Sequence, residues 1–238
     1  MRESSPHFAF ERAIEGLAKT IPGEEVLAAR ASFERRTGAA FPSDPFYEER
    51  TRAFLEELVC EHLLPSGETP AQATLRQSVR QEDAIDREVL VALGRAERGL
   101  FQVEERGGKR LLRCLFGNVR YDITMDSGGL DWTGRLGGGE IFDGRLVPFA
   151  SGLRLLPGLI FHPPQAVACV VEIVKQAKER RVARRDVLDG LLRMRMRHDR
   201  FPGVHPKHFY RFEALWDLEI RSASWRRHGK VLAWPGAQ

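Results

Sequence analysis

A run of short apolar segments separated by glycines, residues 98–162, is the feature that most constrains the fold of this chain. Gly107-Gly108, Gly117-Asn118 and Gly137-Gly138-Gly139 interrupt this run, and such residues tolerate the positive φ angles of tight turns. Short apolar blocks between turn residues are typical of half-buried strands. A parallel sheet would need crossover connections of about a dozen residues or more, for which the spacing leaves little room. We therefore expect a small antiparallel sheet or a half-open barrel.

The segments that fit strands have alternating or continuous apolar residues between the turns. Hairpins are expected at Gly107-Gly108 and at Ala150-Ser151-Gly152, and Trp132 falls in a further short segment. The expected strands are 100–104, 109–116, 119–125, 140–149 and 153–156.

The segments on both sides of this run have the spacing of amphipathic helices. In residues 1–97 we expect helices over 8–19 and 24–36, then one that Asp44 caps, then one from a Thr69–Gln72 capping box to a left-handed Gly94. In residues 163–238 we expect helices from Pro164 to Lys178 and from Arg184 to Arg200, whereas 206–221 fits helix or strand and we favour helix.

The predicted fold class is therefore α+β. A central small antiparallel β-sheet or half-open barrel, residues 98–162, is flanked by an N-terminal helical block, 1–97, and a C-terminal helical block, 163–238. The chain is long enough for these three segments to pack as one globular unit.

Charge is distributed unevenly along the chain. Residues 1–97 have a net charge of −6, residues 98–162 of +2 and residues 163–238 of +8. Opposite charges at the two ends favour either mutual attraction or binding of different partners. Arginine outnumbers lysine 31 to 6, as codon usage in a GC-rich genome would produce, so the basic character alone is weak evidence for nucleic-acid binding.

Cysteine usage and hydropathy predict a cytoplasmic chain without membrane contact. The three cysteines, Cys60, Cys114 and Cys169, form no CxxC pair, which favours reduced thiols, and Cys114 fits a buried small apolar residue. The first residues lack the apolar stretch of a secretory signal, and no apolar run reaches membrane-spanning length.

Candidate catalytic and metal-binding residues form no recognisable motif. The glycines lack the spacing of a phosphate-binding loop, and the carboxylates of the central run, among them Asp143, fit turns and strand ends better than an acid–base pair. His198, His205 and His208 are weak candidates for metal ligands, because their spacing matches no metal motif. We expect no cofactor, and an enzyme that lacks a recognisable motif or depends on a metal is the third functional hypothesis.

A basic amphipathic helix supports sequence-independent nucleic-acid binding as the second hypothesis. Arginines at 193, 197 and 200 share one face of the helix expected over 184–200 and could contact phosphates. The same basic helix could instead pair with Glu56, Glu57 and other acids of the N-terminal block. The candidate binding residues are Arg184, Arg185, Arg193, Arg197, Arg200, Trp225, Arg226 and Arg227.

The favoured hypothesis is a non-catalytic regulatory or adaptor protein that acts through protein–protein contact. Sheets with a solvent-facing side or free edges are docking surfaces for other chains, and blocks of opposite charge can steer a partner. We expect the functional surface where the sheet meets the arginine-rich helix.

Overall fold

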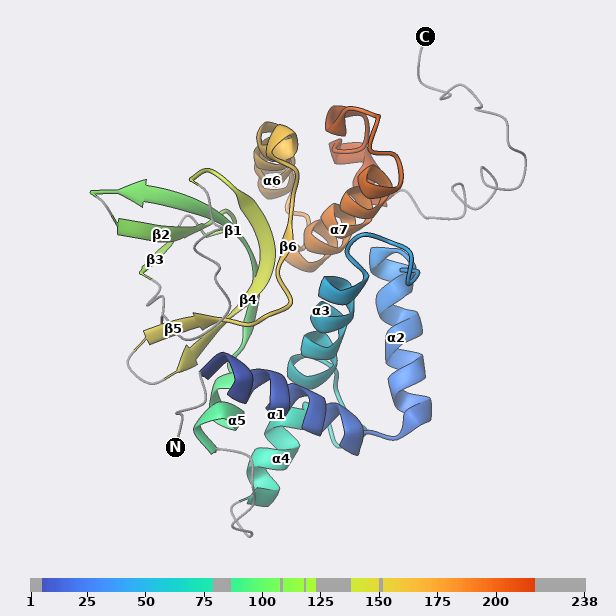
Figure 1. Ribbon diagram of the computed structural model, residues 1–238, viewed down its shortest axis with the longest axis vertical. Helices are drawn as coiled ribbons and strands as arrows, with labels where there is room; N and C mark the ends of the chain where they lie inside the picture. Colours follow the sequence, from blue (N-terminus) through green and yellow to red (C-terminus); the bar gives the residue numbers. More distant parts are fainter. Residues whose placement is uncertain are drawn as a thin grey trace.

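The protein has the α+β fold expected from its sequence, with a curled antiparallel sheet against which two groups of helices pack (Figure 1). The computed structural model describes residues 6–78, 87–107, 109–117, 119–122, 138–149 and 152–216. Within these ranges no helix is long and apolar enough to cross a membrane.

Within the described residues the sheet has six short strands. Five follow the spatial order β3-β2-β1-β4-β5, and β6 pairs with β4 beside β5. All pairs are antiparallel, with Arg106 opposite Lys109 at the β1–β2 hairpin and Phe101 opposite Phe142 between β1 and β4. The strands are β1 (Glu97–Arg106), β2 (Lys109–Cys114), β3 (Arg120–Asp122), β4 (Ile141–Phe149), β5 (Gly152–Leu155) and β6 (Ile160–Phe161).

Helices before the sheet cover one part of it, and helices after the sheet cover another part. The helices before it are α1 (Pro6–Thr20), α2 (Gly23–Thr37), α3 (Tyr47–Cys60), α4 (Pro70–Ser78) and α5 (Arg87–Leu93). Those after it are α6 (Val167–Glu179) and α7 (Arg184–Arg200), with short 3-10 turns η2 (Pro164–Ala166), η3 (Pro206–His208) and η4 (Phe212–Trp216).

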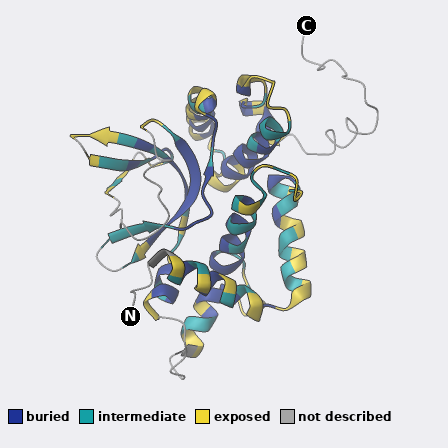
Figure 2. Ribbon diagram, viewed as in Figure 1, coloured by how far each residue is buried: buried dark blue, intermediate teal, exposed yellow. Residues whose placement is uncertain are grey.

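Central strand β4 contributes to both of the apolar cores in which helices pack against the sheet. Its Ile141 packs with Leu100 of β1 against α6, α7 and η4. Its Val147 packs against α1, α3 and α5. Figure 2 shows the resulting continuous burial along β4, α3 and α7, whereas the outer side of α2 is exposed.

Most expected elements are present, and the differences occur mainly at helix ends. The Thr69–Gln72 capping box forms, with Thr69 N donating to Gln72 Oε1 and Gln72 N to Thr69 Oγ1. Asp44 does not cap α3, because its side chain instead accepts a hydrogen bond from Phe41 N and pairs with Arg200. Gly94 is not among the described glycines with positive φ, and so the expected left-handed cap is wrong.

The segment after α7 differs from the helix that the sequence favours. Within 206–216 the chain forms the separate 3-10 turns η3 and η4, which bury Tyr210, Phe212 and Leu215 against the core beside α7. Trp132 and residues 217–238 lie outside the described residues.

Candidate functional site

A buried cluster of charged side chains lies where α2, α3 and α7 meet strands β1 and β4. It joins parts of all three sequence segments, and we call it the charge network. Its carboxylates are Glu56, Glu57, Glu61, Asp143 and Asp189, and its arginines are Arg36, Arg98, Arg145 and Arg185.

Arg145 of β4 connects the sheet to α3. Its side chain is 2% exposed, and Nε and Nη2 donate to Glu61 Oε1 at 3.0 and 2.6 Å. Nη1 lies 3.4 Å from Glu56 Oε2. Burial alone would lower the pKa of Arg145, but Glu61 and Glu56 outweigh it and raise that pKa. Arg145 is therefore a permanent cation in the interior.

Glu56 has a strongly perturbed carboxyl group. Burial raises its pKa to about 7, and the nearby Arg145 only partly opposes that rise. The Gly158 amide donates to Glu56 Oε1, and a Cβ atom at position 158 would come within 2.7 Å of that oxygen. Glycine at 158 therefore allows the backbone to approach Glu56 closely. A carboxyl group with a pKa near 7 suits general acid–base chemistry, but Glu56 is 1% exposed and both of its oxygens have partners.

Arg98 of β1 links the sheet to α7. Its guanidinium group donates two hydrogen bonds to Asp143, at 3.0 and 2.8 Å, and one to Asp189 at 2.7 Å. Burial raises the pKa of Asp143 in spite of Arg98. Burial has the same effect on Asp189, but Arg98 and Arg36 outweigh it, and the pKa of Asp189 is lowered. Asp143 lies within β4, inside the strand expected over 140–149, and pairs with Arg98.

The outer part of the network fastens α2 and α7 to Glu57. Arg36 of α2 donates to Asp189 at 2.5 Å and also to Glu57. Arg185 of α7 donates to Glu57 at 3.2 Å from a side chain that is 54% exposed. A guanidinium group that pairs with two carboxylates, or a carboxylate that pairs with two arginines, fixes the relative orientation of the elements and also balances their charges. The geometry of the network thus indicates that it holds these elements together and does not form an open site.

A second buried polar group lies at the end of β6. His162 is 3% exposed, and its Nδ1 is 3.0 Å from Tyr210 Oη. Burial, with the nearby Arg195, lowers the pKa of His162 to about 3, so the ring is neutral. Its Nε2 has no hydrogen-bond partner among the described residues. Arg195 pairs with Asp199 at 3.1 Å, and burial raises the pKa of Asp199 to about 6.

The arginines predicted to bind a partner do not form one exposed row. Arg193 is buried and donates to Leu215 O, and Arg200 pairs with Asp44 at 2.8 Å. Arg184 and Arg185 are exposed at the start of α7, where Arg184 donates to Arg98 O and lies over the Phe116 ring. Arg197 is partly exposed, and Trp225, Arg226 and Arg227 lie outside the described residues.

The histidines proposed as weak metal ligands lie in the last turn of α7, for His198, and in the segment after it, for His205 and His208. His205 and His208 are exposed, while His198 is half-buried with its Nδ1 3.6 Å from Asp199. The described part of the chain contains no group of three or more His, Cys, Asp or Glu that could hold a metal ion. Cys60, Cys114 and Cys169 are free thiols, and the expected burial of Cys114 is confirmed.

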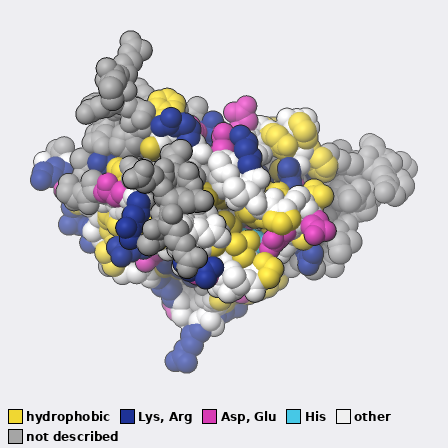
Figure 3. Space-filling model, turned by 90° about the horizontal axis from the view of Figure 1, so that it is seen from below, with side chains coloured by type: hydrophobic (Ala, Val, Ile, Leu, Met, Phe, Trp, Pro, Cys, Tyr) yellow, Lys and Arg dark blue, Asp and Glu magenta, His cyan; other side chains and the backbone are white. Residues whose placement is uncertain are grey.

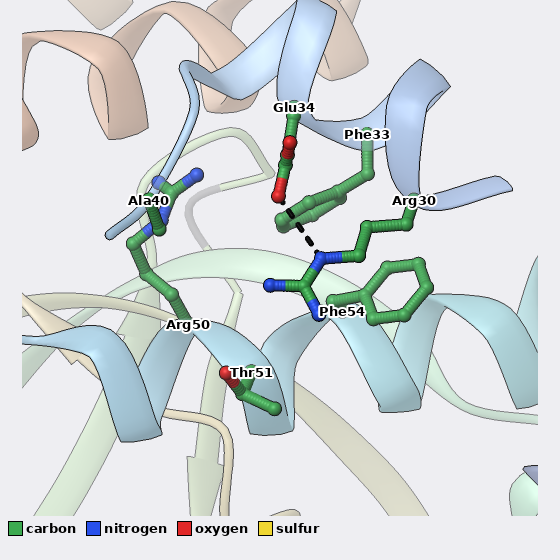
Figure 4. A pocket seen from close by; sticks show the side chains of 7 residues that line it. All are labelled: Arg30, Phe33, Glu34, Ala40, Arg50, Thr51 and Phe54. Atoms are coloured by element: carbon green, nitrogen blue, oxygen red, sulfur yellow. Dashed lines mark hydrogen bonds and ion pairs between the residues drawn. The ribbon is translucent and has the colours of Figure 1, made fainter. Parts of the chain in front are cut away.

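A small pocket lies between α2 and α3, away from the buried charges. Arg30 bonds Glu34 at its edge, and Phe33 and Phe54 form its apolar part (Figure 4). Arg50, whose guanidinium group donates to Thr37 Oγ1 and Gly38 O, also lines it. These side chains stabilise the α2–α3 connection, and they present no nucleophile paired with a base.

The α2–α3 loop meets the end of α7, and both of these segments carry exposed apolar residues (Figure 1). Phe41 is 44% exposed, Phe201 41% and Val204 40%. Arg200 holds the two loops together, because it donates to Ala39 O at 2.6 Å and to Asp44 and stacks over Phe41. We call this the Phe-Pro surface; it consists of Phe41, Pro42, Phe201, Pro202 and Val204.

The alternative that the basic helix pairs with Glu57 is met by Arg185. Sequence reasoning missed the rest of the charge network and the Phe-Pro surface, for different reasons. Asp143 and Arg145 are two residues apart and so share a face of their strand, which was an available signal for a buried pair. The repeated Phe-Pro dipeptide at 41 and 201 carries no such pattern, because only the fold brings the two together. No protein-family model, curated protein or solved structure matches this chain.

Proposed function

We propose that this chain is a non-catalytic regulatory or adaptor protein that acts by binding another protein. The observation that carries the proposal is the exposure of large apolar side chains in both flanking segments, among which Phe41, Phe201 and Val204 lie at the Phe-Pro surface. Leu27 is 70% and Leu63 61% exposed before the sheet, and Trp216 is 51% exposed after it. Exposed apolar side chains that gather into patches mark protein-binding surfaces, whereas singly scattered ones are ordinary.

Arginines that donate hydrogen bonds within the chain support this proposal over phosphate binding. Of the arginines on which a nucleic-acid track depends, Arg193 and Arg200 donate to groups of the same chain. On the face seen in Figure 3, Lys and Arg alternate with acidic and apolar side chains. We also propose a cytoplasmic location, because free thiols suit a reducing compartment.

Affinity capture from the native host tests the proposal directly. The full chain, tagged and expressed at its natural level, should retain one protein in about stoichiometric amount at physiological salt, after nuclease treatment. A chain that elutes as a clean monomer without a partner contradicts it.

Sequence-independent nucleic-acid binding is the second candidate, favoured by the turn between α6 and α7. Arg180, Arg181, Arg184 and Arg185 are all exposed there. Binding of an oligonucleotide should then weaken steeply from low to physiological salt, and Arg181→Glu should reduce the slope. Absence of binding at low salt excludes this candidate.

A further inference from the structure

The Phe-Pro surface combines apolar contact area with a basic surround. From Phe201 to Arg211 the chain contains two Lys or Arg and two His but no Asp or Glu. Lys207, His205 and His208 of this stretch are exposed next to Val204. On the neighbouring loop the acidic Asp44 is already paired with Arg200. The surround is therefore complementary to negative charge.

The apolar residues of this surface are held in place before any partner arrives. The Phe201 ring stacks on Phe209 with centroids 6.3 Å apart and planes 15° apart, and His198 packs edge-on against Phe209. Arg200 fixes the opposite loop through Ala39, Asp44 and Phe41. A preorganised surface loses little conformational entropy on binding, which favours its use as an interface.

We propose that the Phe-Pro surface binds an acidic protein segment that carries an aromatic or aliphatic anchor. The anchor packs between Phe41, Phe201 and Val204, and its flanking carboxylates lie near Lys207 and the two histidines. This inference rests on the proposed protein-binding function and adds a location and a partner chemistry to it. A second copy of the chain is the alternative occupant that the test below distinguishes.

The test selects peptides from a displayed library of random dodecapeptides on the full chain. Peptides that also bind Phe201→Ser/Val204→Ser are removed first. The enriched peptides should be net acidic with at least one aromatic or large aliphatic residue. Their affinity should fall at least about tenfold in the double variant, the size expected when central apolar contacts are lost.

Matched variants control for general surface effects. Val171→Ser changes an exposed valine of α6, 38% exposed against 40% for Val204, and should leave affinity unchanged. Lys207→Glu should weaken binding and its salt dependence, whereas Lys178→Glu, on the exposed end of α6, should not. Circular dichroism confirms that each variant is folded.

Three results would overturn the inference. The first is enrichment of basic or uncharged peptides, or failure to enrich any peptide that binds the wild-type chain but not the double variant. Another is single-stranded oligonucleotide that competes for the same surface and binds more tightly than any peptide. The third is concentration-dependent self-association, by sedimentation, that the double variant abolishes. If the double variant still captures the host partner, the surface is wrong while the protein-binding function stands; if neither chain captures one, the function fails.

Discussion

Arg145 lies in the middle of β4, and all of its guanidinium nitrogens face groups of α3. Buried ion pairs add little net stability over apolar residues, but removal of one partner leaves an uncompensated buried charge. Arg145→Met should therefore lower the free energy of unfolding by about 3–5 kcal/mol, measured by urea denaturation. Arg76→Met is the control: its pair with Glu68 has a side chain 66% exposed, so the loss should be below about 1 kcal/mol. Equal losses in the two variants would contradict a special role for the buried pair.

Glu56 gives the charge network a predictable response to pH. Its pKa of about 7 in the folded chain lies above the ordinary value of 4.5. Between these values the folded state keeps a proton that the unfolded state has released, so stability from this group rises as pH falls from 7 towards 4.5. The full effect is on the order of 3 kcal/mol. Glu56→Gln should remove that rise, as unfolding curves at several pH values would reveal.

Glu61 is the control for that experiment, because its contribution to stability should change with pH in the opposite direction. Burial alone would raise the pKa of Glu61, but Arg145 and Arg98 outweigh it and lower that pKa. Its contribution to stability is therefore present above pH 4.5 and lost as pH falls below it. Glu61→Gln should cost stability at neutral pH and less in acid. The same pH profile for both variants would show that the two carboxyls do not respond individually.

Among the elements, α7 shows which features of the structure the local sequence can predict. Its bounds, Arg184 to Arg200, agree with the expectation, because Val187, Leu188 and Leu191 repeat at helical spacing. The positions of its arginines could not be predicted, since Asp44 and Glu57 reach them only through the tertiary fold. The β1–β2 hairpin was likewise predictable, from alternation and from Gly107, whose φ is +56°. The pairing of β1 with β4 was not, as it joins strands far apart in sequence.

Close packing of α7 against η4 depends on the small size of Gly190. A Cβ atom there would lie 2.6 Å from Leu215 Cδ2 and 3.1 Å from Leu215 Cα. Gly190→Ala should therefore destabilise the protein by about 1–3 kcal/mol in thermal or urea unfolding, despite the better helix propensity of alanine. Gly23→Ala at the start of α2 is the matched change, because nothing lies within 4 Å of the added carbon. It should be neutral or stabilising; a loss as large as at Gly190 would argue against the steric reason.

At the scale of the molecule, the three sequence segments share their interior. Ile141 and Val147 of β4 belong to the apolar clusters of the later and earlier helices respectively. The charge network adds ionic links from α2 and α3 to β1, β4 and α7. Elements that share buried contacts unfold together in single domains. We therefore expect residues 1–97, 98–162 and 163–238 to unfold as one unit, even though their charges differ.

The cysteines report on this expectation, because each segment contains one. Cys60 of α3 is 9% exposed and Cys114 of β2 is 5% exposed, and burial raises the pKa of the Cys60 thiol to about 12. Both should react with a thiol reagent only after unfolding, with the same urea midpoint, as peptide mass spectrometry of labelled samples would measure. Partly exposed Cys169 should react below that midpoint. Separate midpoints for Cys60 and Cys114 would instead mean that the acidic helices and the sheet are independent domains.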